Sequence, residues 1–244
     1  MSNVTLEKTL DVNIMMLEPD RIEVVQGNIM FTMLTTAADD SEQSMQEARI
    51  DHSVNFAKCL TFLELMLDHS LLIPANLEQS FISELAPYNN NLISLPDVNE
   101  TCLLAALHCK LNTICGPNTQ VRVMKFTDTV QGLSYIYDPD PESDSTYPEL
   151  PSTQQEWLGD LPYWDMAWWH REDISTLDRN AFDQDEMDVW IEAKTEADMD
   201  NANMSIFDNI EQTVREASQE NSEPSGELIE VDFKQQTPWK PKFV

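Results

Sequence analysis

The hydrophobic pattern of this chain changes from a period of two to a helical period near residue 38, and this change most limits the fold. In residues 4–36, Val12, Ile14 and Met16 alternate with other residues, which is typical of a strand with one buried face. The pairs Pro19-Asp20 and Gly27-Asn28 have the composition of turns. The region therefore predicts an antiparallel meander.

A long helix is expected directly after these strands. Asp39 and Glu42 have the spacing of a capping box, in which each side chain satisfies a free amide at a helix start. Apolar residues then recur every three or four positions to about Leu72, and Pro74 stops the pattern. A shorter helix is expected at 77–85.

A second long helix and a hairpin complete the predicted core. Asp97 and Glu100 repeat the capping spacing and open a helix to about Cys115, which is apolar on nearly every side and therefore expected at the centre. The segments 121–126 and 133–137 predict two strands of a hairpin around a glycine.

The predicted fold class is α+β. An antiparallel sheet, built from the N-terminal meander and the hairpin near 121–137, packs on two or three helices. The predicted organisation is a core domain at 1–137, an acidic proline-rich loop at 138–151, a tryptophan-rich acidic helical segment packed on the core at 152–217, and a disordered tail at 218–244.

The net charge of the chain limits its possible binding partners more than any sequence motif does. The chain has 44 acidic and 14 basic residues, and residues 136–244 hold 27 of the acids. A net charge of −30 repels nucleic-acid phosphates and anionic membranes, so neither is expected as a direct partner. The sequence has no apolar run long enough for a membrane span and no apparent secretion signal, so we expect a cytoplasmic protein with reduced cysteines.

The loop after residue 137 resembles a calcium loop in its spacing only. Acidic residues occupy positions 1, 3, 5, 7 and 12 of this loop, namely Asp138, Asp140, Glu142, Asp144 and Glu149. Position 6 should be glycine and is Ser143, and three prolines stiffen the loop. A solvated acidic loop is the favoured interpretation, and weak cation binding is the alternative.

Tryptophans and acids are interleaved in the second half of the chain. The aromatic candidates for partner binding are Trp157, Tyr163, Trp164, Trp168 and Trp169. Tryptophan anchors with an acidic rim are typical of an interface, but the same residues also fit a satellite core folded back on the main domain. Both interpretations stay open here.

An acidic helix is expected from Ala181 to about Ala197, with a further helix at 206–217. Four acids fall near one stripe of the acidic helix, namely Asp185, Asp188, Glu192 and Glu196. The stripe is either a solvated helix face or part of a surface for a basic partner.

No enzyme motif is present, and no cofactor is expected. The five glycines form no phosphate-binding loop or nucleophile elbow. We therefore expect a non-enzymatic acidic protein that docks on a basic surface of a nucleic-acid-handling protein and modulates or inhibits it. The alternatives are an assembly component of a multiprotein particle, a phage or viral one for example, and a carboxylate-based metal-dependent enzyme.

Overall fold

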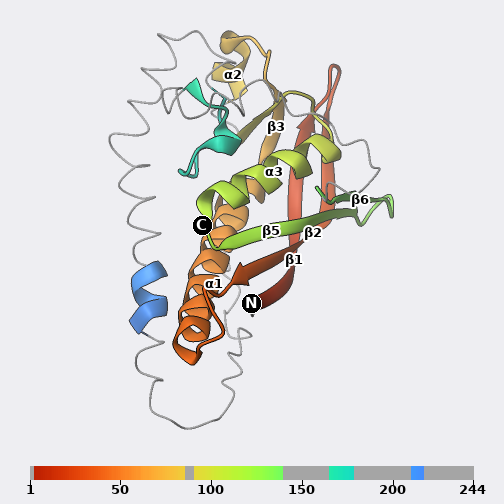
Figure 1. The fold of residues 1–244 in the computed structure, drawn as a ribbon. Helices are drawn as coiled ribbons and strands as arrows, with labels where there is room; N and C mark the ends of the chain where they lie inside the picture. Colours follow the sequence, from red (N-terminus) through yellow and green to blue (C-terminus); the bar gives the residue numbers. More distant parts are fainter. Residues whose placement is uncertain (1–2, 86–90, 140–164, 179–209, 217–244) are drawn as a thin grey trace, which may run out of the picture.

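The computed structural model describes residues 3–85, 91–139, 165–178 and 210–216, and it has an α+β fold (Figure 1). Its elements are, in chain order, β1 (Asn3–Leu17), β2 (Ile22–Thr36), α1 (Glu42–Phe62), a π-helical turn (Leu63–Leu67), β3 (Leu71–Pro74), α2 (Gln79–Leu85), β4 (Leu92–Leu95), α3 (Glu100–Ile114), β5 (Thr119–Asp128), β6 (Ser134–Tyr137) and a 3₁₀ turn (Trp168–His170).

The sheet is mixed, so the prediction of an antiparallel sheet is wrong for part of it. Its six strands have the order β4-β3-β1-β2-β5-β6. β1, β2, β5 and β6 are antiparallel, as the hairpin prediction requires, whereas β3 pairs in parallel with both β1 and β4. β3 and β4 have four residues each and are almost wholly buried, so they lack the alternation that identifies an exposed strand in a sequence.

The predicted N-terminal meander is one long hairpin instead. β1 and β2 pair along all 15 residues of each strand, from Asn3–Thr36 to Leu17–Ile22. Gly27-Asn28, predicted as a turn, lies inside β2. Gly27 serves close packing there, because a β-carbon at this position would lie 2.4 Å from Cζ of Phe126.

The first helix starts and ends at other residues than the pattern predicted. Its N-cap is Ser41, whose hydroxyl accepts a hydrogen bond from the Ser44 amide, and Asp39 accepts one from the Ser41 amide instead. The helix turns into a π-helical turn and ends at Leu67, because His69 adopts a left-handed conformation with φ of 60°. Residues 71–74 are thereby released from the helix to form β3.

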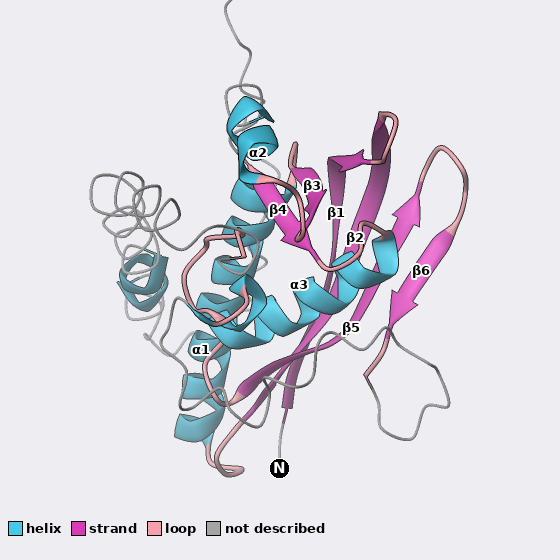
Figure 2. Ribbon diagram, turned by 90° about the horizontal axis from the view of Figure 1, so that it is seen from above, coloured by secondary structure: helices cyan, strands magenta, loops and turns pink. Residues whose placement is uncertain are grey.

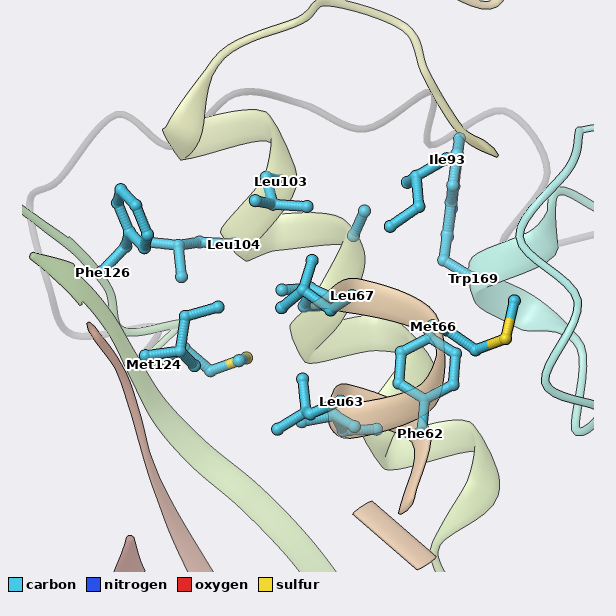
Figure 3. Packing of buried hydrophobic residues seen from close by; sticks show 14 of the residues in the cluster. Phe62, Leu63, Met66, Leu67, Ile93, Leu103, Leu104, Met124, Phe126 and Trp169 are labelled. Carbon is cyan, nitrogen blue, oxygen red and sulfur yellow. The ribbon is translucent and has the colours of Figure 1, made fainter. Parts of the chain in front are cut away.

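α3 is the central helix, as its apolar composition predicted. Asn99, rather than Asp97, is its N-cap and accepts a hydrogen bond from the Cys102 amide. α1 and α3 cover the same face of the sheet (Figure 2). Leu103 and Leu104 of α3 lie between Phe62 and Leu67 on one side and Phe126 of β5 on the other (Figure 3).

The segment 165–178 closes the outer edge of the sheet next to β4. The Ser94 amide donates to the Thr176 carbonyl, and the Thr176 hydroxyl donates to the Leu92 carbonyl across a separation of 84 residues. The Trp168 indole donates to the Ser94 carbonyl at 2.6 Å. β4 therefore does not present a free edge on this side.

Several predicted features lie outside the described residues. These are most of the acidic loop, the acidic helix at 181–197 and the tail at 218–244. Of the helix predicted at 206–217, residues 210–216 are described and helical, and Arg215 lies 3.9 Å from Asp51 of α1. Within the described part of the chain, no helix combines the length and apolarity needed to cross a membrane.

Replacing Gly27 with alanine tests the close packing against Phe126. The added methyl group would overlap the Phe126 ring and approach the Thr127 carbonyl to 2.8 Å, so we expect a loss of about 1–3 kcal/mol in the free energy of unfolding. Gly116→Ala is the control, because its nearest neighbour would be an Asn55 side-chain atom at 3.5 Å. Urea denaturation of both variants measures the difference, and equal stabilities would contradict this role of Gly27.

Candidate interaction site

Two of the predicted tryptophan anchors are core residues. Trp168 is fully buried and Trp169 is 3% exposed. The Trp168 ring stacks on Phe62 of α1 with ring centroids 6.5 Å apart, and Trp169 packs edge-on against Trp168. Neither ring is presented to a partner in this structure, so for these two residues the satellite-core interpretation replaces the interface interpretation. Burying such large apolar rings stabilises the fold more than exposing them would.

A buried lysine attaches the segment 165–178, which contains Trp168 and Trp169, to the core. Lys110 of α3 is fully buried, and its Nζ donates hydrogen bonds to the carbonyl oxygens of Trp168 at 3.0 Å and Arg171 at 2.5 Å. Asp173 lies 3.7 Å from the same nitrogen. The guanidinium group of Arg171 donates a hydrogen bond to the Leu177 carbonyl in the same segment.

Burial changes the protonation of this lysine. Removal from water lowers the pKa of Lys110 to about 7, and Asp173 opposes this change. A lysine with such a pKa is often a reactive amine, but this one is enclosed and bonded to two carbonyl groups. We therefore assign Lys110 to holding the segment 165–178 in place and not to catalysis.

A groove with an apolar lining lies at the closed end of the β1–β2 hairpin, and we call it the hairpin-end groove. It has a volume of about 990 Å³. Its apolar lining comes from the hairpin, the ends of β3 and β4, and α2, and comprises Leu17, Pro19, Ile22, Pro74, Leu77, Phe81, Leu85, Pro96 and Val98. Ile22 is 48% exposed and Phe81 is 40% exposed, so large apolar side chains face solvent here.

The rim of the hairpin-end groove is acidic. It carries Glu18, Asp20 and Asp97, with Arg21 as the basic residue. Arg21 is held by Glu18 at 2.8 Å and by Glu23 at 3.3 Å, so its charge is compensated locally. The groove therefore combines an apolar floor with a net negative rim.

A second, more polar pocket of about 710 Å³ lies between the end of α3 and the start of β5. Asn112 joins the two elements there: its Nδ2 donates to the Val121 carbonyl at 3.0 Å, and its Oδ1 accepts from the Val121 amide at 2.8 Å. The pocket wall also contains Cys115, Arg122 and Asp138.

His108 is the titratable side chain of this pocket with the clearest perturbation. Its ring lies 5.1 Å from the Tyr137 ring, and its Nε2 is 3.2 Å from Nδ2 of Asn112. Burial lowers the pKa of His108, with Asp138 acting in the opposite direction, so the neutral imidazole is favoured. The contact with the Asn112 amide and the burial of the ring are typical of a packed histidine.

Most of the predicted site residues lie outside the described residues. These are Trp157, Tyr163, Trp164, Asp185, Asp188, Glu192 and Glu196 for partner binding, and Asp140, Glu142, Asp144 and Glu149 for a cation. Asp138 is described and borders the polar pocket. Within the described ranges, no three His, Cys, Asp or Glu side chains are placed to hold a metal ion together.

Comparison with known proteins adds little. No family model and no curated protein matches the chain. Among solved structures, 6-pyruvoyltetrahydropterin synthase from Plasmodium vivax aligns at a TM-score of 0.34 and 11% identity, over 57% of this chain and 99% of the synthase. An uncharacterized protein from Wolinella succinogenes aligns at 0.33 and 12%, over 57% of this chain and all of its own. Likenesses this weak carry no argument about activity.

Sequence reasoning missed the hairpin-end groove, because its lining comes from four separate segments. The strongest available signal was the apolar stripe of the helix predicted at 77–85, where Leu77, Phe81 and Leu85 recur at four-residue intervals. A stripe of this kind shows that a face is apolar, but it does not show which other segments meet it.

The buried amine of Lys110 predicts a specific pH dependence of stability. Because the pKa is about 7 in the folded protein and 10.5 is the ordinary value, the unfolded chain binds more protons between these values. Stability therefore increases as the pH rises from 7 towards 10.5. Relative to Lys110→Met, the wild-type free energy of unfolding should rise by at most about 5 kcal/mol between about pH 6 and about pH 10.

Urea denaturation of both proteins across this pH range measures the difference. Other titrating groups cancel, since both proteins contain them. A difference that stays constant with pH would show that Lys110 keeps an ordinary pKa.

Proposed function

We propose that this chain is a non-enzymatic acidic protein that binds a basic and partly apolar segment of another protein. A nucleic-acid-handling protein is the partner class that we infer, because surfaces that bind phosphates are basic. Binding would modulate or inhibit such a partner by covering its basic surface. The observation that carries this proposal is the hairpin-end groove, with its apolar floor and acidic rim.

The apolar floor supports a protein partner over a purely ionic one. Phe81 and Ile22 expose side chains that would be desolvated on binding, and burial of apolar surface contributes about 25 cal/mol per Å². Aromatic residues at the centre of an interface often carry much of its binding energy.

Charge supports a basic partner over an acidic one. The net charge of −30 would attract a basic segment over long range, and Asp20 and Asp97 lie at the groove itself. Such attraction increases association rates at low ionic strength and is screened as salt is added.

A pair of matched peptides tests this proposal. We expect a fluorescent peptide that alternates lysine with leucine and phenylalanine to bind the full chain, with an affinity that falls as NaCl is added. A peptide with glutamate in place of lysine should not bind. Phe81→Ala should lower the affinity for the lysine peptide about tenfold, because it removes the exposed aromatic ring from the groove.

The control variant is Glu47→Gln, which removes one exposed carboxylate near the start of α1. The start of α1 lies at the opposite end of the molecule from α2 (Figure 1). It should bind the peptide nearly as the wild type does. Equal binding by the Phe81→Ala and Glu47→Gln variants, measured by fluorescence anisotropy, would exclude the groove as the binding site.

A second candidate function, an assembly component of a multiprotein particle, is supported by the free edge of β1. β3 pairs with β1 only at Met15 and Met16. Within the described residues, no strand pairs with the remainder of this edge. Its alternate residues, including Thr5 and Thr9, are exposed. A long unpaired strand edge is a template for pairing with another chain.

A second copy of this chain fits the edge. Antiparallel pairing of two β1 edges about Leu6 places each Leu6 opposite its symmetry mate and each Lys8 opposite Val4 of the other copy. Leu6 is 40% exposed, although it has the parity of the core-facing residues Val12 and Ile14. Pairing would cover this side chain without placing like charges directly opposite each other.

The substitution Thr9→Pro tests this pairing of two β1 edges. The Met15 amide points away from β2, towards Ser70, and the strand alternation gives Thr9 the same direction. Thr9→Pro therefore removes an outward amide without breaking the β1–β2 ladder, whereas Thr9→Ala keeps the amide. By multi-angle light scattering, the wild type and Thr9→Ala should form dimers, and Thr9→Pro should be monomeric.

Salt separates the two candidate functions. Added NaCl should strengthen self-association, since it screens the repulsion between two highly acidic chains, whereas it should weaken the binding of the basic peptide. A wild type that stays monomeric at all concentrations and salt levels would rule out the assembly through β1 and leave the proposal for the groove unaffected.

A further inference from the structure

Two of the four cysteines meet where α1 contacts the end of α3. The sulfur atoms of Cys59 and Cys115 are 3.6 Å apart, although the residues are separated by 56 positions. All four cysteines are free thiols in this structure. Cys102 and Cys109, in contrast, lie seven residues apart on α3, which is about two helical turns.

The backbone around this pair is already held in place. Asn55, one turn before Cys59 on α1, accepts a hydrogen bond from the Gly116 amide at 3.0 Å, and its Nδ2 donates to the Thr119 hydroxyl at 2.9 Å. The Thr119 hydroxyl in turn forms a hydrogen bond with the hydroxyl of Thr35 on β2. The turn that follows α3 is therefore fixed against α1 on the same helix face that carries Cys59, so the two sulfur atoms meet without further ordering of the chain.

The two thiols differ in access. Cys59 is fully buried, whereas Cys115 is partly exposed and lines the polar pocket between α3 and β5. Burial raises the pKa of the Cys59 thiol, which makes it a poor first nucleophile. Cys115 also follows the last residue of α3 and has an extended conformation with ψ of 150°, so its side chain is not packed within a helical turn.

We propose that Cys59 and Cys115 form a thiol–disulfide modification site, oxidised by small disulfides such as oxidised glutathione that enter through the polar pocket. The chemistry takes place in two exchange steps. First, Cys115 Sγ attacks the small disulfide, which forms a mixed disulfide on Cys115 and releases one small thiol. Cys59 Sγ then attacks Cys115 Sγ, which closes the protein disulfide and releases the second small thiol.

The balance of the reaction is complete. The protein loses two electrons and two protons in forming one S–S bond, and the small disulfide gains both to become two thiols. Only Cys115 needs contact with the oxidant, since the second step occurs within the protein. A disulfide has a sulfur–sulfur distance of about 2.05 Å, so rotation of the side chains must bring the two sulfur atoms closer by about 1.5 Å.

The consequence of oxidation would be a covalent bond between α1 and the wall of the polar pocket. Cys115 and the adjacent Gly116 both line that pocket. The reduced and oxidised forms would thus differ at a solvent-accessible cavity and not only in the core.

Thiol counting and peptide mapping test the site. We expect oxidised glutathione to reduce the number of thiols of the folded full-length chain from four to two, counted with a chromogenic disulfide after unfolding. Mass spectrometry of the digested protein should identify one cross-link, between Cys59 and Cys115. Dithiothreitol should restore four thiols.

Single variants separate the two steps. In Cys59→Ala, the second step is blocked, so a glutathionyl group should remain on Cys115. In Cys115→Ala, neither a cross-link nor an adduct should form. The double variant Cys102→Ala/Cys109→Ala is the matched control, because it also removes two thiols but should still cross-link as the wild type does.

Three results would overturn the proposal. The first is a wild-type protein that keeps all four thiols, the second is a cross-link that includes Cys102 or Cys109, and the third is a stable glutathionyl adduct on Cys115 of the wild type without a cross-link. If Cys115→Ala fails to fold, the Cys102→Ala/Cys109→Ala variant still decides, because Cys59 and Cys115 are its only thiols.

Discussion

The pairing of β1 with β2 is the interaction on which the other features of this molecule depend. Fifteen residues of each strand form one uninterrupted ladder. One face of this hairpin is covered by α1 and α3, and its closed end forms part of the groove. Within the described residues, a strand pairs with its outer edge only at Met15 and Met16. The core and both candidate interaction surfaces are therefore parts of the same two strands, and a change in their register would move all three together.

The parts of the fold that depend on local pattern could be predicted from the sequence. The helical period and the apolar composition of α3 identified a central helix, and the hairpin of β5 and β6 followed from two extended segments around a glycine. β3 and β4 could not be predicted, because buried parallel strands of four residues have no alternation and take their hydrogen bonds from distant segments.

The same limit applies to turns and sites. Gly27-Asn28 has the composition of a turn, but the ring of Phe126, almost 100 residues later in the chain, decides that Gly27 lies within a strand. The hairpin-end groove, the hydrogen bond from Lys110 to the Trp168 carbonyl and the contact between Cys59 and Cys115 also join residues from distant segments. The residues of these sites can be read from the sequence one by one, but the contacts between them cannot. For Trp168 and Trp169 the sequence left two interpretations open, an interface and a satellite core, and their burial makes them core residues.

The contacts of the segment 165–178 have a consequence for how this protein can be made. The Ser94 amide donates to the Thr176 carbonyl, and the Ser94 carbonyl accepts from the Trp168 indole. The amine of Lys110 donates to the carbonyl groups of Trp168 and Arg171. During synthesis, a chain that has grown only to β6 would leave the edge of β4 bare and an amine in the core without its carbonyl partners. The final native state of the N-terminal half must therefore wait until the ribosome has released residue 178, and a fragment that ends near residue 137 would be an incomplete folding unit.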